Sequence, residues 1–329
     1  MTAKTGLLRN RPRYAARLNG FKNAVGGSTS SHDLLQAAAR VDGLNAADLN
    51  FPDHFEGTDP KALAGHISDL GLALNGLAMR YYTDPGFKLG AFTNPDPKVR
   101  EAALDITKRG IDACLAMNGN LMTLWMGQDG FDYPFQMDYG AAWDWTIDAL
   151  QKVCDHAPEC EIAIEYKPNE PRAFALMPDI GTTLLACKEV ARNNLGVTLD
   201  FAHVLYADEM PAHSAHLVGR HSKLLGLHLN DGYGKRDDGL IAGSVHPIQT
   251  LELLVEAERQ GYDGIIYFDT FPDAGGLDPI KEAEASITLV ERLRDVAKEL
   301  SDHTELSQAI AQQDAATSMK IIAAELYGA

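Results

Sequence analysis

Short apolar runs alternate along the chain with longer stretches in which apolar residues recur at helical spacing. The short runs predict eight strands, at residues 16–21, 47–51, 73–79, 121–126, 161–166, 195–200, 224–230 and 264–269. The longer stretches predict eight helices, at residues 31–41, 59–70, 97–117, 140–156, 181–193, 210–219, 247–260 and 279–300. This strict alternation is typical of a parallel sheet with helical crossovers, and eight units favour a closed (β/α)8 TIM barrel of the α/β class. No Gly-rich phosphate loop follows the first strand, which disfavours a dinucleotide-binding sheet.

The chain continues beyond the eighth helix that a barrel needs. Residues 1–300 are therefore predicted to form the TIM barrel, and residues 301–329 a C-terminal helical extension. Apolar residues recur in the extension at roughly helical spacing, among them Ile310, Met319 and Ile322. Two interpretations stay open, a helix packed on its own barrel or an oligomerisation arm onto a neighbouring subunit. We expect a homo-oligomer, either a dimer or a tetramer.

Composition and charge narrow the classes of partner. The 329 residues are 45% hydrophobic and 23% charged, which is ordinary globular composition. The net charge of −17 disfavours nucleic acid and anionic membranes, because both would be repelled. No apolar run approaches the ~18 residues of a membrane span, and no apolar segment follows the basic N-terminus as in a signal peptide. The four cysteines lack metal-site spacing and are expected to be thiols in a reducing compartment, so a cytoplasmic location is expected.

Metal-ligating residue types occupy the ends of four consecutive predicted strands. Strands five to eight carry Glu165, Asp200, His228 and Asp269 there. The C-terminal ends of barrel strands meet at one mouth, so these side chains are expected to converge. One acidic residue at a strand end is more often a helix N-cap or an ion-pair partner, but a cluster repels itself and favours a divalent cation. The donor set suits Mn²⁺ or Mg²⁺, with Co²⁺ possible.

Four segments carry a resemblance to a known family. IEYKPNEP, LDFAH, LHLNDGYGKRDDGLIAGS and YFDT resemble the xylose isomerase-like TIM barrels, most closely the L-rhamnose isomerase branch of pseudomonad type. The resemblance covers about residues 15–300 and is stronger in the second half of the barrel. It implies a metal-dependent aldose–ketose isomerase whose first metal ion is bound by Glu165, Asp200, His228 and Asp269.

The resemblance also implies a second ion and a catalytic pair. His203, three residues after Asp200, would bind the second ion together with a carboxylate from the loop after strand seven. The family has Asp-x-Asp in that loop, whereas this chain reads GKRDDGL, so Asp237 and Asp238 both remain candidates. Lys167, two residues past Glu165, matches the lysine that such isomerases place on the substrate oxygen, and both residues are expected to be catalytic. One or two ions are expected.

Residues from the first half of the barrel are further candidates. His54 follows strand two and could contact the sugar or help to open its ring, although it could equally be an ordinary loop histidine. Trp125 ends strand four and resembles the indole that sugar isomerases use as an apolar wall; the other interpretation is barrel core. Arg80 and Tyr82 follow strand three and could reach substrate hydroxyls.

The expected substrate is a small non-phosphorylated sugar, because no phosphate-binding loop or basic cluster lies near the predicted mouth. An L-rhamnose-like, pentose or branched sugar would fit. One alternative is a ketose 3-epimerase, which resembles this chain on strands five to seven but ends strand eight with a second glutamate, where this chain has Asp269. The other alternative is a sugar-binding barrel without catalytic activity.

Overall fold

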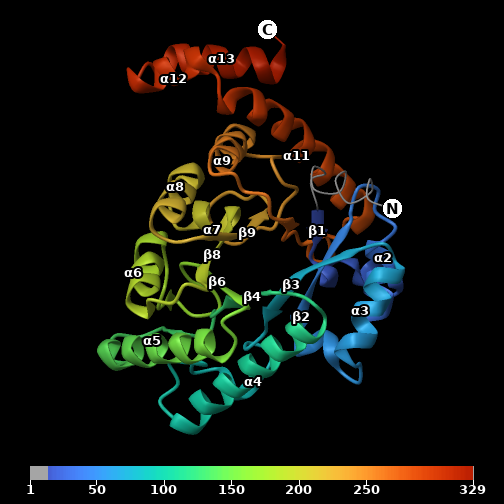
Figure 1. Cartoon of the computed structure of the whole chain (residues 1–329), viewed down its shortest axis with the longest axis vertical. Coiled ribbons are helices and arrows are strands. Elements are labelled where there is room, and N and C mark those ends of the chain that lie inside the picture. Colours follow the sequence, from blue (N-terminus) through green and yellow to red (C-terminus); the bar gives the residue numbers. More distant parts are fainter. Residues whose placement is uncertain (1–13, 329) are drawn as a thin grey trace.

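A computed structural model describes residues 14–328, and its centre is one parallel sheet of eight strands (Figure 1). The strands are β1 (Tyr14–Ala16), β2 (Ala46–Phe51), β3 (Ala73–Met79), β4 (Leu121–Trp125), β6 (Glu161–Glu165), β8 (Leu195–Asp200), β9 (Leu224–Leu229) and β10 (Ile266–Phe268). Their order around the sheet is β1-β10-β9-β8-β6-β4-β3-β2, with parallel pairing throughout. The two end strands meet where the Asn45 N–H donates to the Tyr14 carbonyl at 3.1 Å. The predicted TIM barrel is confirmed, in a nearly closed form.

The crossover helices surround this sheet, as Figure 1 shows. They are α2 (Ser31–Ala38), α3 (Pro60–Asp69), α4 (Pro97–Ala116), α5 (Tyr139–His156), α6 (Ile180–Val190), α8 (Pro211–His221), α9 (Pro247–Arg259) and α11 (Pro279–Ser301). Several begin at an Asp-Pro pair, as Asp59, Asp96 and Asp278 illustrate. In each pair the Asp side chain accepts main-chain N–H groups of the first turn, while the Pro at the first helical position needs no N–H partner.

The first predicted strand is wrong in position. The strand is β1, at Tyr14–Ala16, whereas the expected range was 16–21. Residues Leu18–Val25 form a 3-10 helix, η1, in which Leu18 and Phe21 are both buried. A spacing of three places two apolar side chains on one face of a 3-10 helix, so this pattern also fits a helical turn. Arg17 consequently lies just past the C-terminal end of β1, at the barrel mouth.

Smaller elements line the mouth and were not predicted. A short helix, α7 (Phe201–Tyr206), follows β8 directly, and α10 (Pro272–Gly275) lies shortly after β10. The loops carry two 3-10 turns, η2 (Asp53–Phe55) and η3 (Pro85–Phe87). Two further strands, β5 (Gly130–Phe131) and β7 (Phe174–Ala175), pair antiparallel and join the segments that follow β4 and β6. These elements fix the loops that carry the candidate site.

The C-terminal extension forms two helices, α12 (Thr304–Ala311) and α13 (Ala315–Tyr327), at one end of the molecule (Figure 1). Leu306 is buried against the rest of the chain and Ile322 is partly buried, whereas Ile310 and Met319 remain about half exposed. The domain boundary and the oligomerisation arm stay predictions. Within residues 14–328, no helix has the length and apolar character needed to cross a bilayer. The signal-peptide prediction concerns residues 1–13, outside the described range.

Candidate metal centre

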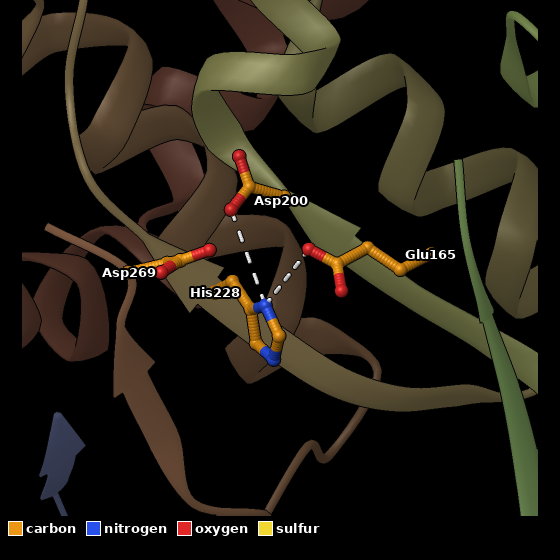
Figure 2. A group of neighbouring side chains, drawn as sticks. All are labelled: Glu165, Asp200, His228 and Asp269. Carbon is orange, nitrogen blue, oxygen red and sulfur yellow. Dashed lines mark hydrogen bonds and ion pairs between the residues drawn. The ribbon is translucent and has the colours of Figure 1, made fainter. Parts of the chain in front are cut away.

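Four side chains from consecutive barrel strands converge at the C-terminal mouth (Figure 2). Glu165 and Asp200 are the last residues of β6 and β8, His228 lies near the end of β9, and Asp269 follows β10 directly. Parallel register places Asp200 opposite His228, so neighbouring strands present these side chains at the same level. One ligand atom from each of the four lies within 4.8 Å of the others. The sequence expectation of spatial convergence is therefore met in the structure.

The imidazole of His228 lies between the carboxylates. Its Nδ1 is 3.1 Å from Oε1 of Glu165 and 3.9 Å from Oδ2 of Asp200, the two contacts drawn in Figure 2. The Oδ1 atom of Asp269 is buried and has no hydrogen-bond partner among the described residues; the closest cation is Arg17, whose Nε lies 4.0 Å away. Buried polar oxygens normally have a hydrogen-bond partner, so this oxygen is a candidate coordination position.

Crowding and burial disturb the proton affinities of these groups. Burial raises the pKa of the Asp200 carboxyl to about 7. Burial also raises the pKa of Asp269, and the charge of Glu165 adds to the effect. At His228 burial disfavours the imidazolium, but Glu165 outweighs it and the pKa rises to about 9. Three carboxylates in one buried site are costly without a compensating cation, and a divalent ion would supply that charge.

Asn230 and Tyr267 contact members of this four-residue cluster. The Asn230 Nδ2 donates to Oδ1 and Oδ2 of Asp200 at 3.2 and 3.1 Å, and to the Asp269 carbonyl at 3.1 Å. The Tyr267 ring lies 4.5 Å, centroid to centroid, from the imidazole of His228. Sequence reasoning did not identify either residue. The position of Asn230, two residues past the histidine on the same strand face, was the signal that could have found it.

A second cluster adjoins the first. His203 lies on α7, one turn after Asp200, whose side chain caps that helix by accepting the His203 N–H at 3.0 Å. The His203 Nε2 is 3.2 Å from Oδ2 of Asp237, and its Nδ1 is 3.7 Å from Oε1 of Glu165. Among the described residues, His203 Nδ1 and Asp237 Oδ1 are buried without a hydrogen-bond partner. The Nζ of Lys167 lies 3.1 Å from the same Oδ2 of Asp237.

The loop after β9 places Asp237 and Asp238, the two candidate ligands of the second ion, in different surroundings. Asp237 points toward His203, as its contact shows. Asp238 instead holds its own loop, because Oδ2 accepts the Tyr233 N–H at 2.9 Å and Oδ1 accepts from Nε of Arg236 at 2.8 Å. The structure brings Asp237 to the cluster and does not bring Asp238, whose two oxygens are used by the loop.

A cavity of about 290 Å³ opens beside the four residues, near the lower end of small-molecule sites. The three residues predicted to bind substrate line one wall. Arg80 Nη1 donates to the Tyr82 hydroxyl at 3.0 Å, and the Tyr82 ring meets Trp125 edge-on at 5.1 Å. Lys167 Nζ lies 5.4 Å from the centre of the Trp125 ring, and it also contacts Asp237 of the second cluster. Residues that sequence reasoning missed also line the cavity: Arg17, Asp48, Glu170, Tyr267 and Phe271.

His54 is not brought to the cavity, contrary to its predicted catalytic role. It is buried beneath the mouth, where its Nδ1 accepts the Asn50 N–H at 3.0 Å. The Nε2 therefore carries the ring proton and faces Oδ1 of Asn19 at 3.4 Å. Burial, with Arg80 as the largest nearby charge, lowers the pKa of His54 to about 3. The neutral ring connects β2 to η1, which is a structural role and not a catalytic one.

Comparison with known proteins adds sequence relatives and solved structures. Xylose isomerases from Thermus thermophilus and Thermus caldophilus are 29% and 27% identical to this chain, each over 209 residues. Those residues are 62% of this chain and 54% of each relative, so the chain spans about half the length of the curated relatives it matches.

The solved structures share the fold at low sequence identity. A D-tagatose 3-epimerase-like protein has a TM-score of 0.70 at 16% identity, covering 87% of this chain and 98% of the other. An L-ribulose 3-epimerase has a TM-score of 0.69 at 14% identity, covering 89% and 98%. Residues 35–299 match the family described as the Xylose isomerase-like TIM barrel. The match covers most of the chain, and the protein therefore belongs to the xylose isomerase-like TIM barrel family.

Proposed function

We propose that this protein is a divalent-metal-dependent aldose–ketose isomerase that acts on a non-phosphorylated sugar. The observation that supports it most is the meeting of Glu165, Asp200, His228 and Asp269, with one ligand atom from each within 4.8 Å of the others. Lys167 adds a cationic donor on the wall of the adjoining cavity. A metal centre beside a buried lysine is an arrangement that polarises a sugar oxygen.

The four residues fit a divalent ion. Three carboxylates and one imidazole suit Mn²⁺ or Mg²⁺, with Co²⁺ possible, and the unpartnered oxygen of Asp269 is available as a ligand. His203 and Asp237 would hold a second ion, because each keeps a buried polar atom without a hydrogen-bond partner among the described residues. When bound, the metal supplies Lewis-acid polarisation of two neighbouring sugar oxygens.

Lys167 would act on the substrate oxygen as a proton-bearing donor. Burial disfavours its ammonium, but Asp237 and Glu170 outweigh burial and raise its pKa, so the ammonium persists at neutral pH. A permanently charged ammonium stabilises negative charge developing on O1 or O2 while hydrogen moves between C1 and C2. The indole of Trp125, which lines the same cavity, would supply an apolar surface for the C–H groups of the sugar.

A ketose 3-epimerase is the strongest competing function, because solved structures with that description share the fold. An epimerase removes and returns a proton at C3, and the ketose 3-epimerases that this chain resembles use a glutamate from strand eight for that work. This chain has Asp269 there, which is shorter by one methylene and lies with Glu165, Asp200 and His228 in the candidate metal cluster. The presence of Lys167, His203 and Asp237 also favours the isomerase. A sugar-binding barrel without turnover is the third possibility.

The substrate proposal is an L-rhamnose-like, pentose or branched sugar, following the L-rhamnose isomerase branch that the motifs resemble. We further propose that the chain works as a homo-oligomer, a dimer or a tetramer. The extension at residues 301–329 would be the arm, because Ile310 and Met319 expose about half of their apolar side chains.

The function is tested by product analysis on metal-stripped and Mn²⁺-reconstituted protein. Aldoses and ketoses, including L-rhamnose and D-xylose, are incubated and the products are separated and identified. Interconversion of aldose and ketose that EDTA abolishes and Mn²⁺ restores supports the isomerase. Metal-dependent inversion at C3 without aldose formation would replace it with the epimerase. Metal binding without any product would leave only the binding protein.

A further inference from the structure

Asp48 places a carboxylate on the inner face of the barrel, in the wall of the candidate cavity. Side chains of a strand alternate between its two faces, so Asp48 shares the inner face of β2 with Ala46, which is buried against Ala15 and Tyr267. Asp48 itself is only partly buried and lines the cavity. Barrel interiors are usually filled by branched apolar side chains, so a carboxylate at this level needs a polar counterpart.

The protein satisfies only one of the two oxygens of Asp48. The Asn75 Nδ2 donates to Oδ2. The Oδ1 atom has no hydrogen-bond partner among residues 14–328, and it is not one of the enclosed unpartnered atoms of the chain, so it is open to the cavity. Burial raises the pKa of Asp48 to about 6, against the effect of the Asn75 hydrogen bond. The ionised carboxylate, which only accepts hydrogen bonds, therefore predominates at neutral pH.

The other carboxylates that line the cavity each have a nitrogen partner. Glu165 lies 3.1 Å from His228, Asp237 and Glu170 lie 3.1 and 3.0 Å from Lys167, and Asp269 lies 4.0 Å from Arg17. Within the described part of the chain, Asp48 has no basic side chain within 4.0 Å, and its one hydrogen bond comes from an uncharged amide. A neutral donor from a ligand, such as a hydroxyl group, would complete its hydrogen bonding.

The strand order places Asp48 across the cavity from the candidate metal centre. Three strands lie between β2 and β8 in either direction around the nearly closed barrel. Asp48 on β2 is therefore on the opposite wall from Asp200, which ends β8. A sugar whose O1 and O2 lie at the metal centre would extend across the cavity and bring the hydroxyls of its later carbons toward β2.

We propose that Asp48 is a specificity-determining residue whose Oδ1 accepts a hydrogen bond from a sugar hydroxyl beyond C2. The substrate is then a neutral sugar with a hydroxyl at the carbon that reaches Asp48, and a sugar deoxygenated there binds weakly. L-Rhamnose-like, pentose and branched sugars all carry hydroxyls beyond C2. A hydroxyl that donates to a carboxylate forms a charge-assisted bond, which a methylene group forfeits. This rests on the proposed function only for the placement of O1 and O2 at the metal centre.

The test uses alditols, which have no carbonyl group and cannot be isomerised. Ribitol, xylitol, L-arabinitol, D-glucitol and L-rhamnitol are titrated into the protein in Mg²⁺ by calorimetry. The tightest-binding alditol is then compared with its monodeoxy analogues at each carbon beyond C2. The variants are Asp48→Ala, Asp48→Asn and, as a matched control, Asp42→Ala, because Asp42 is exposed in the loop before β2. Asp48→Asn keeps the size of the side chain and guards against misfolding of the alanine variant.

In the wild type and in Asp42→Ala, deoxygenation at one position is expected to weaken binding at least about tenfold. Asp48→Ala should weaken binding of the intact alditol to a similar degree, and the same deoxygenation should then cost little more, because the two partners of one hydrogen bond are coupled. Asp48→Asn exchanges a charged acceptor for a neutral amide, so the deoxygenation penalty should fall at least about threefold.

Three results would overturn the proposal. They are no binding of any of these alditols by the wild type, an alditol affinity that Asp48→Ala leaves unchanged, and deoxygenation penalties that are the same in the wild type and in the Asp48 variants. The titrations involve no turnover, so failure of the isomerase assay is distinguished from failure of this proposal.

Discussion

The side-chain amide of Asn230 holds the carboxylate of Asp200, donating to its two oxygens at 3.2 and 3.1 Å. The Asn230 Oδ1 in turn accepts the Ala202 N–H at 2.8 Å, which ties the candidate ligand to the first turn of α7. A partner of this kind orients a metal ligand and raises its affinity for the ion.

Replacing Asn230 is therefore expected to weaken metal binding without removing a ligand. Asn230→Ala should lower Mn²⁺ affinity by about 10–100-fold, as loss of a ligand-orienting partner does. Asn194→Ala is the matched control, because its Nδ2 also donates to buried main-chain carbonyls but lies before β8, at the opposite end of that strand. Calorimetry gives the affinity and thermal unfolding the stability. Equal affinities in the two variants would show that Asn230 contributes only to folding.

Replacing Asp269 should separate the stability of the metal-free protein from its response to metal. Burial and the neighbouring Glu165 raise the pKa of Asp269, so its charge is costly at neutral pH in the metal-free state. Asp269→Asn should keep or raise the unfolding temperature of the metal-free protein. It should lose the stabilisation by metal, which in free energy of unfolding amounts to about 2.7 kcal/mol at a metal concentration a hundred times the Kd. Asp273→Asn, which removes the other carboxylate near Arg17, should retain that stabilisation. A full metal response in Asp269→Asn would exclude it as a ligand.

Metal affinity should rise with pH. In the metal-free protein, burial disfavours the imidazolium of His228, but the nearby Glu165 carboxylate favours it more strongly. The pKa of His228 is therefore raised to about 9. Below that pH the imidazole carries a proton that an incoming ion must displace, and above it no such cost remains. Affinity for Mn²⁺ should therefore increase from pH 7 toward 9 and then level off. Calorimetry in two buffers of different ionisation enthalpy measures the proton release directly, and an affinity independent of pH over this range would contradict it.

Lys167→Met should stop turnover while leaving the first ion bound. The variant keeps an unbranched side chain, one heavy atom shorter, but loses the ammonium, which lies 3.1 Å from Asp237 and 3.0 Å from Glu170. A loss of at least about 10²–10⁴-fold in kcat is expected for removal of a proton-bearing catalytic group. Lys223→Met is the control, because that lysine pairs with Glu161 at the other end of β6. Unchanged kcat in Lys167→Met would refute the catalytic role.

The second half of the barrel could be predicted well because its strands end in chemically distinctive residues. Parallel strands align their C-terminal ends, so Glu165, Asp200, His228 and Asp269 could be placed together from sequence alone. The first strand could not, because Leu18 and Phe21 suit a strand or a 3-10 turn equally well. The helical extension and the barrel helices were located because their apolar spacing repeats over several turns.

Loop geometry set the limit for the remaining site residues. Asp237 and Asp238 are adjacent in the sequence, and only the fold of their loop directs the first to His203 and the second to the Tyr233 N–H. His54 resembled a mouth residue, but the hydrogen bond from Asn50 turns its ring into the protein. Asp48 lies inside a predicted strand, so its place on the cavity wall became visible only with the neighbouring strands assembled.

Locating a bound ion tests the central claim most directly. Crystals grown with Mn²⁺ and measured near the manganese absorption edge would give an anomalous difference map that identifies the ion by its position. The expected result is a peak bonded to one atom each of Glu165, Asp200, His228 and Asp269, at the ~2.0–2.3 Å typical of such ligands. A well-occupied manganese peak elsewhere, with these four side chains uncoordinated at saturating Mn²⁺, would contradict it.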